Sequence, residues 1–212
     1  NYSLIIREEP NVRTITAKQF SLREALAKPK SAANPVLNSR DTLYIFPAES
    51  ERELGEVVTR FKKQARSDEP VKLVEVVGNV EYPGEYPLTE GMTVQQLLHS
   101  AFDVKEYTDR DYALLKRVNV AKNKVEFEVV RISSAKSLSK PLKELDKLYV
   151  FNLNEPREDI IADLIEDIKS QTSKTYEESL VTINGQVRFP GTYPLSNGMT
   201  AADLVSAAGG YK

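Results

Sequence analysis

The feature that most constrains this chain is an internal repeat. Residues 78–101 (GNVEYPGEYPLTEGMTVQQLLHSA) return as residues 185–208 (GQVRFPGTYPLSNGMTAADLVSAA), with a constant offset of 107 residues and 12 of 24 positions identical. Self-similarity of this kind indicates that one structural unit is used more than once along the chain. The remaining segments are therefore expected to belong to further parts of that unit.

The repeated block predicts a short hairpin followed by a helix. An aliphatic, mostly β-branched run leads into each copy and favours a strand. The Pro-Gly pairs at 83–84 and 190–191 predict type II turns with a positive φ at the glycine. A helical pattern follows the second glycine of each copy, and Thr93 and Gln96 have the spacing of a capping box. In the second copy an aspartate replaces the glutamine, which is a weaker match to that box.

The segments outside the block also occur twice. Residues 2–7 resemble residues 112–117, and residues 37–46 resemble residues 142–151. We therefore predict an α+β chain of tandem units joined by amphipathic helical linkers. In chain order it comprises the back half of a unit (1–46), a helical linker (47–70), a complete unit (71–151), a second helical linker (152–177) and the front half of a unit (178–212).

The two half units contain complementary portions of one unit. Each would leave an unpaired sheet edge, and open edges favour association with further strands. We therefore expect residues 1–46 and 178–212 to combine into a composite unit, either within one chain or between neighbouring chains by swapping.

Apolar residues at helical spacing predict the two linker helices. Ser50 and Glu53 have capping-box spacing at the start of the first, and Pro156 stands where the first turn of the second tolerates proline. Neither apolar stretch approaches the roughly 20 residues that cross a bilayer. The two helices are expected to pack against other parts of the protein.

Composition narrows the possible functions. A formal net charge of −2 argues against generic nucleic-acid binding. The absence of cysteine excludes disulfides and thiolate chemistry in these 212 residues. The glycines match turns rather than a phosphate-binding loop, and the sequence has neither a nucleophile elbow nor an HExxH helix. We therefore assign no catalytic residue, cofactor or metal ligand and expect a protein that is not an enzyme.

Several side chains have the chemistry of ligand contacts. His99, the single histidine, is expected to be a solvated helix residue, and the aspartates at 159, 163 and 167 to form the polar face of the second linker. Ten basic residues lie between Lys105 and Lys143 and favour an anionic polymer, but acidic residues are interleaved with them. Four aromatic residues flank the Pro-Gly turns and are candidates for stacking on sugar rings, for packing at the turn and sheet edge, or for contact with another subunit: Tyr82, Tyr86, Phe189 and Tyr193.

The spacing Val/Ile-x-Gly-x-Val-x-x-Pro-Gly-x-Tyr-Pro-Leu-x-x-Gly-Met-Thr-x-x-x-Leu resembles the SLBB domain, the soluble-ligand-binding variant of the β-grasp fold. The second copy ends in Ala208-Gly209-Gly210, also typical of that family, whereas the first has Phe102-Asp103 at this point. The matching positions are Gly78, Val80, Pro83, Gly84, Tyr86, Leu88, Gly91, Thr93 and Leu97 in the first copy, and Gly185, Val187, Pro190, Gly191, Tyr193, Leu195, Gly198, Thr200 and Leu204 in the second.

Tandem copies of this motif are similar to the periplasmic part of Wza-like polysaccharide export proteins, which form rings that carry capsule or exopolysaccharide across the outer membrane. The resemblance implies a periplasmic protein associated with the outer membrane through parts absent from this chain. It also implies self-association into a ring and, as partners, polysaccharide and inner-membrane export machinery, but no nucleic acid. The alternative is a carbohydrate-binding or small-ligand module, for example one that binds cobalamin.

Overall fold

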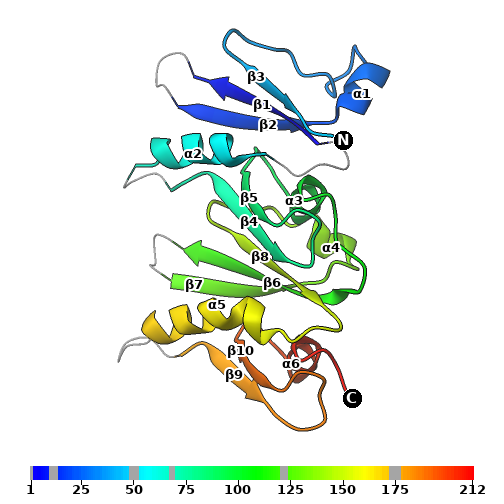
Figure 1. The fold of residues 1–212 in the computed structure, drawn as a ribbon, viewed down its shortest axis with the longest axis vertical. Coiled ribbons are helices and arrows are strands. Elements are labelled where there is room, and N and C mark those ends of the chain that lie inside the picture. The colour runs from blue at the N-terminus through cyan, green and yellow to red at the C-terminus, as the bar shows by residue number, and fades with distance from the viewer. Residues whose placement is uncertain (1, 10–13, 48–52, 67–69, 120–123, 172–177) are drawn as a thin grey trace.

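Three blocks of structure are stacked along the long axis of the molecule (Figure 1). The computed structural model describes residues 2–9, 14–47, 53–66, 70–119, 124–171 and 178–212, and its mixture of helices and sheets confirms the α+β class. The elements run β1 (Ser3–Glu8), β2 (Ile15–Phe20), α1 (Leu22–Ala27), β3 (Thr42–Ile45), α2 (Gly55–Gln64), β4 (Leu73–Gly78), β5 (Gly84–Pro87), α3 (Val94–Ser100), β6 (Thr108–Asn119), β7 (Lys124–Val130), α4 (Ala135–Leu138), β8 (Lys147–Asn152), α5 (Glu158–Gln171), β9 (Leu180–Ile183), β10 (Gly191–Pro194) and α6 (Ala201–Ala207).

The middle block is a five-stranded sheet in the order β5-β4-β8-β6-β7. Strand β4 runs parallel to β8, with Val76 opposite Leu148, whereas the other neighbours are antiparallel. Parallel neighbours need a long crossover, and here the crossover contains α3, the β6–β7 hairpin and α4. The inner face of the sheet packs on α3, where Val76, Leu148 and Leu97 are fully buried in one apolar cluster.

The first block is a three-stranded sheet that reproduces part of the middle one. Its order, β2-β1-β3, corresponds to β7-β6-β8. Ser3 lies opposite Ile45 in β1–β3, just as Ala113 lies opposite Val150 in β6–β8. The sequence resemblance of these segments therefore reflects a shared strand register.

An ion pair at the end of each sheet is repeated as well. Arg7 donates to both carboxylate oxygens of Asp41 (Nε–Oδ1 2.9 Å, Nη2–Oδ2 2.7 Å), and Arg117 does the same to Asp146 (2.9 and 2.6 Å). The Asn38 amide also donates to Asp41. Hydrogen bonding from Arg7 lowers the pKa of Asp41 from 3.8 to about 2, since a charge-assisted bond favours the ionised carboxylate.

This pKa shift predicts an acid-dependent loss of stability. A depressed carboxyl pKa contributes stability that is complete above the unfolded pKa and disappears as the pH falls through the folded pKa. Above pH 4 the unaltered protein should have a higher free energy of unfolding than the Asp41→Asn variant. The difference between the two proteins should shrink between about pH 4 and pH 2. Urea titrations of both proteins measure this difference. The contributions of the other carboxyl groups are common to both proteins and cancel. A difference that stays constant down to pH 2 would contradict the assignment.

The third block repeats the hairpin and helix of the middle block. Gly191 lies opposite Ile183 in β9–β10, as Gly84 lies opposite Val76 in β4–β5. Both helices begin with a complete capping box, so the predicted box at Thr93 is confirmed and the aspartate of the second copy completes its box too. The type II turn prediction is wrong, because Gly84 has φ 150° and Gly191 has no positive φ.

The two copies leave their helices by the same route despite different residues. Phe102 and Asp103 have φ values of 63° and 74°, close to the 77° and 86° of Gly209 and Gly210. The hydrogen bonds also match, because the amides of Asp103 and Gly210 each reach back to a carbonyl of their own helix. The absence of glycines in the first copy thus leaves the fold unchanged, at the cost of left-handed backbone in two L-residues.

Each linker helix lies between two blocks (Figure 1). Val57 and Phe61 of α2 are buried in the apolar cluster that joins the first block to the middle one, and Ile161 and Leu164 of α5 are buried in the cluster that joins the middle block to the third. The helix α2 begins at Gly55 without a side-chain cap, and the cap predicted at Ser50 falls outside the described residues. No helix in the described ranges has the length and apolarity that a bilayer crossing requires.

The two half units lie at opposite ends of the long axis (Figure 1). Strands β3 and β9 accordingly belong to separate sheets. The expectation that residues 1–46 and 178–212 combine within one chain is therefore not met, because the complete unit and both linker helices stand between them. Combination between neighbouring chains remains a prediction.

Candidate functional site

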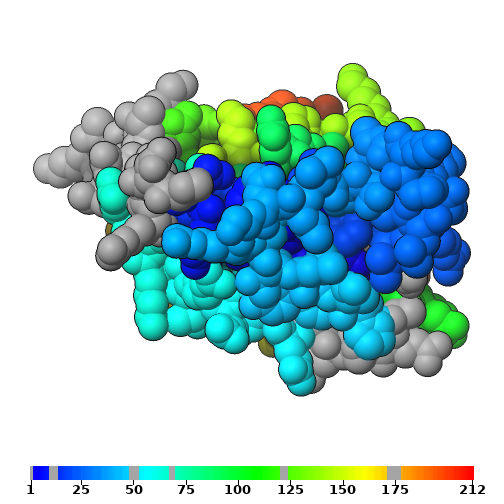
Figure 2. Space-filling model, turned by 90° about the horizontal axis from the view of Figure 1, so that it is seen from above, coloured from blue at the N-terminus to red at the C-terminus, as the bar shows by residue number. Residues whose placement is uncertain are grey.

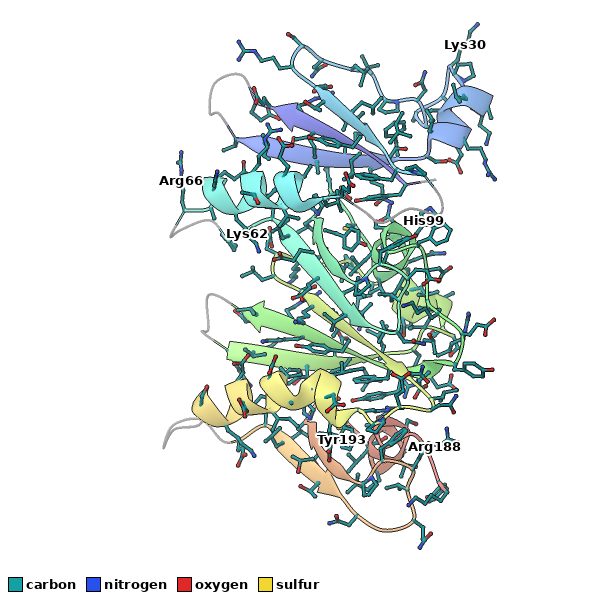
Figure 3. All side chains as sticks on the ribbon, in the orientation of Figure 1. Lys30, Lys62, Arg66, His99, Arg188 and Tyr193 are labelled. Carbon is teal, nitrogen blue, oxygen red and sulfur yellow. The ribbon has the colours of Figure 1, made fainter. Side chains whose placement is uncertain are left out.

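Two of the four aromatic candidates are buried. Tyr86 and Tyr193 are 2% and 3% exposed, and each hydroxyl donates to a carbonyl at the start of its own turn, that of Tyr82 (2.6 Å) and of Phe189 (2.7 Å) respectively. Burial also raises the pKa of Tyr193, whose ring lies between α5 and the C-terminal elements (Figure 3). The rings of Tyr86 and Tyr193 therefore cannot stack on a sugar from solvent, and these two residues hold the hairpins together.

The other two aromatic candidates are half-buried. The ring of Tyr82 lies against Phe102, with 6.0 Å between centroids, and the ring of Phe189 lies 5.8 Å from the guanidinium of Arg157. Tyr82 and Phe189 come from hairpins at different levels of the stack, so they do not form one site. Each remains a candidate for a separate contact with a sugar or with another subunit.

Arg157 is a buried polar side chain that lies between the middle block and the third. It is 1% exposed and pairs with Asp109. Its Nη1 donates to the carbonyls of Ser206 (3.1 Å) and Ala207 (2.5 Å), where α6 ends, and its guanidinium lies 5.2 and 4.9 Å from the rings of Tyr112 and Phe151. One side chain thus connects the complete unit to the following half unit.

Sequence reasoning missed Arg157. It stands next to Pro156 at the start of the second linker, and the sequence assigns no role to it or to its partner Asp109. In the structure Asp109 accepts hydrogen bonds from the Arg157 guanidinium and from the backbone amides of Asp111 and Tyr112 (both 3.0 Å). No sequence signal predicts this pair, because its partners are brought together by the packing of separate blocks.

A cleft of about 940 Å³ lies between the first block and the middle one. Its walls come from β1 and β2 on one side and from α3 and the neighbouring turns on the other. The lining mixes both signs of charge with apolar surface, so it selects no single charge class. The lining residues that illustrate this are Arg7, Lys18, Lys72, Glu90, Leu142 and Lys143.

Five of the nine described basic residues from Lys105 to Lys143 form ion pairs with acids. Lys116 lies 3.4 Å from Asp167, and Arg117 lies 2.6 Å from Asp146. Further pairs join Lys105 to Glu81, Arg131 to Asp203 and Lys140 to Glu128. These pairs balance part of the basic charge that favoured an anionic polymer, so charge alone does not predict such a ligand.

The remaining candidates lie on solvated surface. His99 is exposed on the outer side of α3 (Figure 3). The aspartates at 159, 163 and 167 are exposed along α5. In the described parts of the chain, no three His, Cys, Asp or Glu side chains are grouped as a metal site.

A comparison with protein families matches the SLBB domain to residues 73–101 and 180–212. These ranges are the hairpin and helix of the middle block and of the third, and they identify the chain as SLBB-containing. The domain is β-grasp-like, serves binding or transport rather than catalysis, and is found in polysaccharide export proteins and in ligand-binding modules. A search of curated proteins gave no match to the chain.

Proposed function

We propose that this chain is a non-enzymatic, periplasmic portion of an outer-membrane polysaccharide export protein and forms part of an oligomeric ring. The occurrence of SLBB domains in export proteins supports this class of function. The observation that carries the proposal is the continuous packing of successive units. Each linker helix is buried between two of them, which suits a tall, stiff wall better than a pair of independently moving domains.

In this role the chain performs no chemistry on the polymer. Its units form one segment of a ring wall, and the number of subunits sets the width of the lumen through which capsule or exopolysaccharide passes. Ion pairs such as Lys116–Asp167 and Arg117–Asp146 balance part of the basic charge of the complete unit, which suits a passage that must not hold an anionic polymer tightly. Inner-membrane export machinery is the expected partner that delivers the polymer.

Gene disruption in the source bacterium tests the proposal. Cells without the protein should lose polysaccharide from their surface while retaining polymer inside, and complementation should restore export. The protein extracted from membranes in mild detergent should run as a ring-sized oligomer. Unchanged surface polysaccharide, or a strictly monomeric extracted protein, would refute the proposal.

The cleft between the first and middle blocks favours a second candidate, a binding module for a glycan or a small ligand such as cobalamin. Its volume of about 940 Å³ lies within the range of ligand pockets. Calorimetric titration with oligosaccharides, together with the absorbance of added cobalamin, tests this. A Thr16→Trp change, which places a large side chain in the lining of the cleft, should weaken binding, whereas Lys30→Trp on exposed surface should not. Absence of both heat and spectral change in the unaltered protein would exclude this function.

A further inference from the structure

The two junctions between successive blocks differ along one face of one strand. Strand β2 borders the first junction as β7 borders the second, and the β1–β2 and β6–β7 hairpins have the same register. Alternate residues of a strand share a face. On β7 and just beyond its end, the residues that face the third block are Phe127, Val129 and Arg131. At the same positions of β2 stand Ala17, Gln19 and Ser21. Both walls of each junction belong to the described chain, so these residues are a difference between the junctions themselves.

Large and charged side chains close the second junction. Phe127 is 2% exposed within the apolar cluster that joins the middle block to the third. Its carbonyl accepts a hydrogen bond from the Asn197 amide (3.0 Å). Arg131 forms an ion pair with Asp203 on α6. A ring and an ion pair thus fill the space between β7 and α6.

Smaller residues leave a groove at the first junction. Ala17 and Gln19 line one wall of the cleft of about 940 Å³, and Gln96 of α3 lines the other. Gln19 and Gln96 also line a pocket of about 440 Å³, which shares His99 with a third pocket of about 370 Å³ in the complete unit. The cleft and these two pockets together form the α3 groove, with His99 on the outer side of α3 (Figure 3). Figure 2 looks down on the first block, which forms the upper wall of this groove.

Two glutamines from different blocks lie where the cleft and the second pocket join. Gln96 Oε1 accepts the Thr93 amide in the capping box (2.9 Å), which holds this side chain and leaves its Nε2 free to donate. Gln19 Oε1 is buried and accepts no hydrogen bond from the described residues. A buried acceptor without a donor raises the free energy of the protein, so a ligand that supplies a donor gains affinity.

The lining of the groove indicates the class of ligand. A hydroxyl group suits the two glutamines, because it donates one hydrogen bond and accepts another. Charges of both signs line the outer pockets, such as Arg23 and Glu24 in one and Asp103 and Arg110 in the other, so a net charge on the ligand is not selected. Apolar side chains in the third pocket offer contact to the C–H faces of a sugar ring: Leu98, Ile132 and Leu138.

We propose that the α3 groove binds a segment of an uncharged oligosaccharide, one of whose hydroxyls donates to Gln19 Oε1 and accepts from Gln96 Nε2. Rotation about the last bond of the Gln19 side chain brings Oε1 to the surface of the groove. The inference rests on the binding function proposed for the cleft and narrows its ligand to a neutral glycan. A chain of sugars follows the cleft and both pockets, whereas a compact ligand such as cobalamin occupies the cleft alone.

Calorimetric titration with uncharged hexasaccharides of glucose, galactose and mannose tests the proposal, with an oligogalacturonate hexamer as the acidic comparison. At least one uncharged hexamer should give saturable heat, and the acidic hexamer should bind no more tightly. Gln19→Leu and Gln96→Glu should each weaken binding at least tenfold. The matched control is Gln186→Leu, which changes an exposed glutamine of the third block and should leave the affinity unchanged.

Thermal unfolding separates a binding role from a structural one. Gln19→Leu removes a buried oxygen that has no partner among the described residues, so its Tm should not fall although binding does. Gln96→Glu keeps an acceptor for the Thr93 amide, as a capping box requires, and should also retain its Tm. Ala17→Phe introduces the side chain that β7 carries at Phe127 and should weaken binding by narrowing the cleft.

The outcomes distinguish the ligand class from the binding function itself. If an uncharged hexamer binds the unaltered protein and both glutamine variants equally well, the assignment to the groove is overturned and the binding function stands. Tighter binding of oligogalacturonate would overturn the choice of a neutral ligand. Absence of heat with every uncharged hexamer would overturn the proposal, and the added-cobalamin titration then decides whether the cleft binds a small ligand instead.

Discussion

Replacing Arg157 with methionine should lower the free energy of unfolding by about 3–5 kcal/mol, because Asp109 is left buried without its charge partner. The variant also loses the two bonds to the end of α6 and the contacts with the rings of Tyr112 and Phe151. The third block should loosen first. Protection of β9, β10 and α6 against hydrogen exchange should fall more than protection of the complete unit.

Two further variants separate the buried charge from general damage. Arg188→Met removes an exposed arginine whose side chain donates a hydrogen bond to the Leu153 carbonyl (2.7 Å). This variant should lower the free energy of unfolding by at most about 1 kcal/mol. Adding Asp109→Asn to Arg157→Met should recover part of the loss, because the amide oxygen can still accept the backbone amides of Asp111 and Tyr112. Equal losses for Arg157→Met and Arg188→Met would show that Arg157 does not join the blocks.

The repeat made most of the fold predictable. Matching segments predicted matching strands, the capping box at Thr93 and helical linkers, since these depend on residues close together in sequence. The Pro-Gly pairs do not form the predicted type II turns, because strand pairing begins at Gly84 and Gly191 and sets their φ more strongly than the dipeptide preference does.

The candidate site was harder to predict than the fold. A tyrosine beside a turn can stack on a ligand or pack into the core, and sequence does not distinguish these two roles. Tyr86 and Tyr193 pack into the core. Arg157 and Asp109 are 48 residues apart and meet only through the packing of blocks. The cleft was likewise unpredictable, because it is bounded by two blocks whose relative placement the sequence does not encode locally.

Gly78→Ala should destabilise the chain by about 3–5 kcal/mol, through strain at a positive φ together with disruption of the parallel β4–β8 pair. The added Cβ would meet backbone, the Val150 carbonyl oxygen at 1.9 Å, which has no flexible end that can move aside. Urea unfolding followed by circular dichroism measures the loss.

Gly185→Ala is the matched control at the equivalent glycine. Its φ of 97° is almost the same but its Cβ position is open, so only the cost of a left-handed alanine remains, about 1–2 kcal/mol. The comparison is made at a concentration where the chain is monomeric. Equal losses at the two glycines would mean that close approach of β8 is not what makes Gly78 necessary.

The account depends on one claim, that these 212 residues hold one complete unit and two halves that each match a part of it. Amide hydrogen exchange by NMR on the dilute monomer tests it directly. The amides of Glu75 and Asn79 donate across the β4–β8 pair to Asp146 (2.9 Å) and Val150 (2.8 Å) and should be strongly protected. Thr182 in β9 and Gln186 just beyond it occupy the same places, and no strand of the described structure pairs with β9 on that side. Their amides should exchange at least a hundredfold faster. Equal protection of the two sets in the monomer would contradict the account.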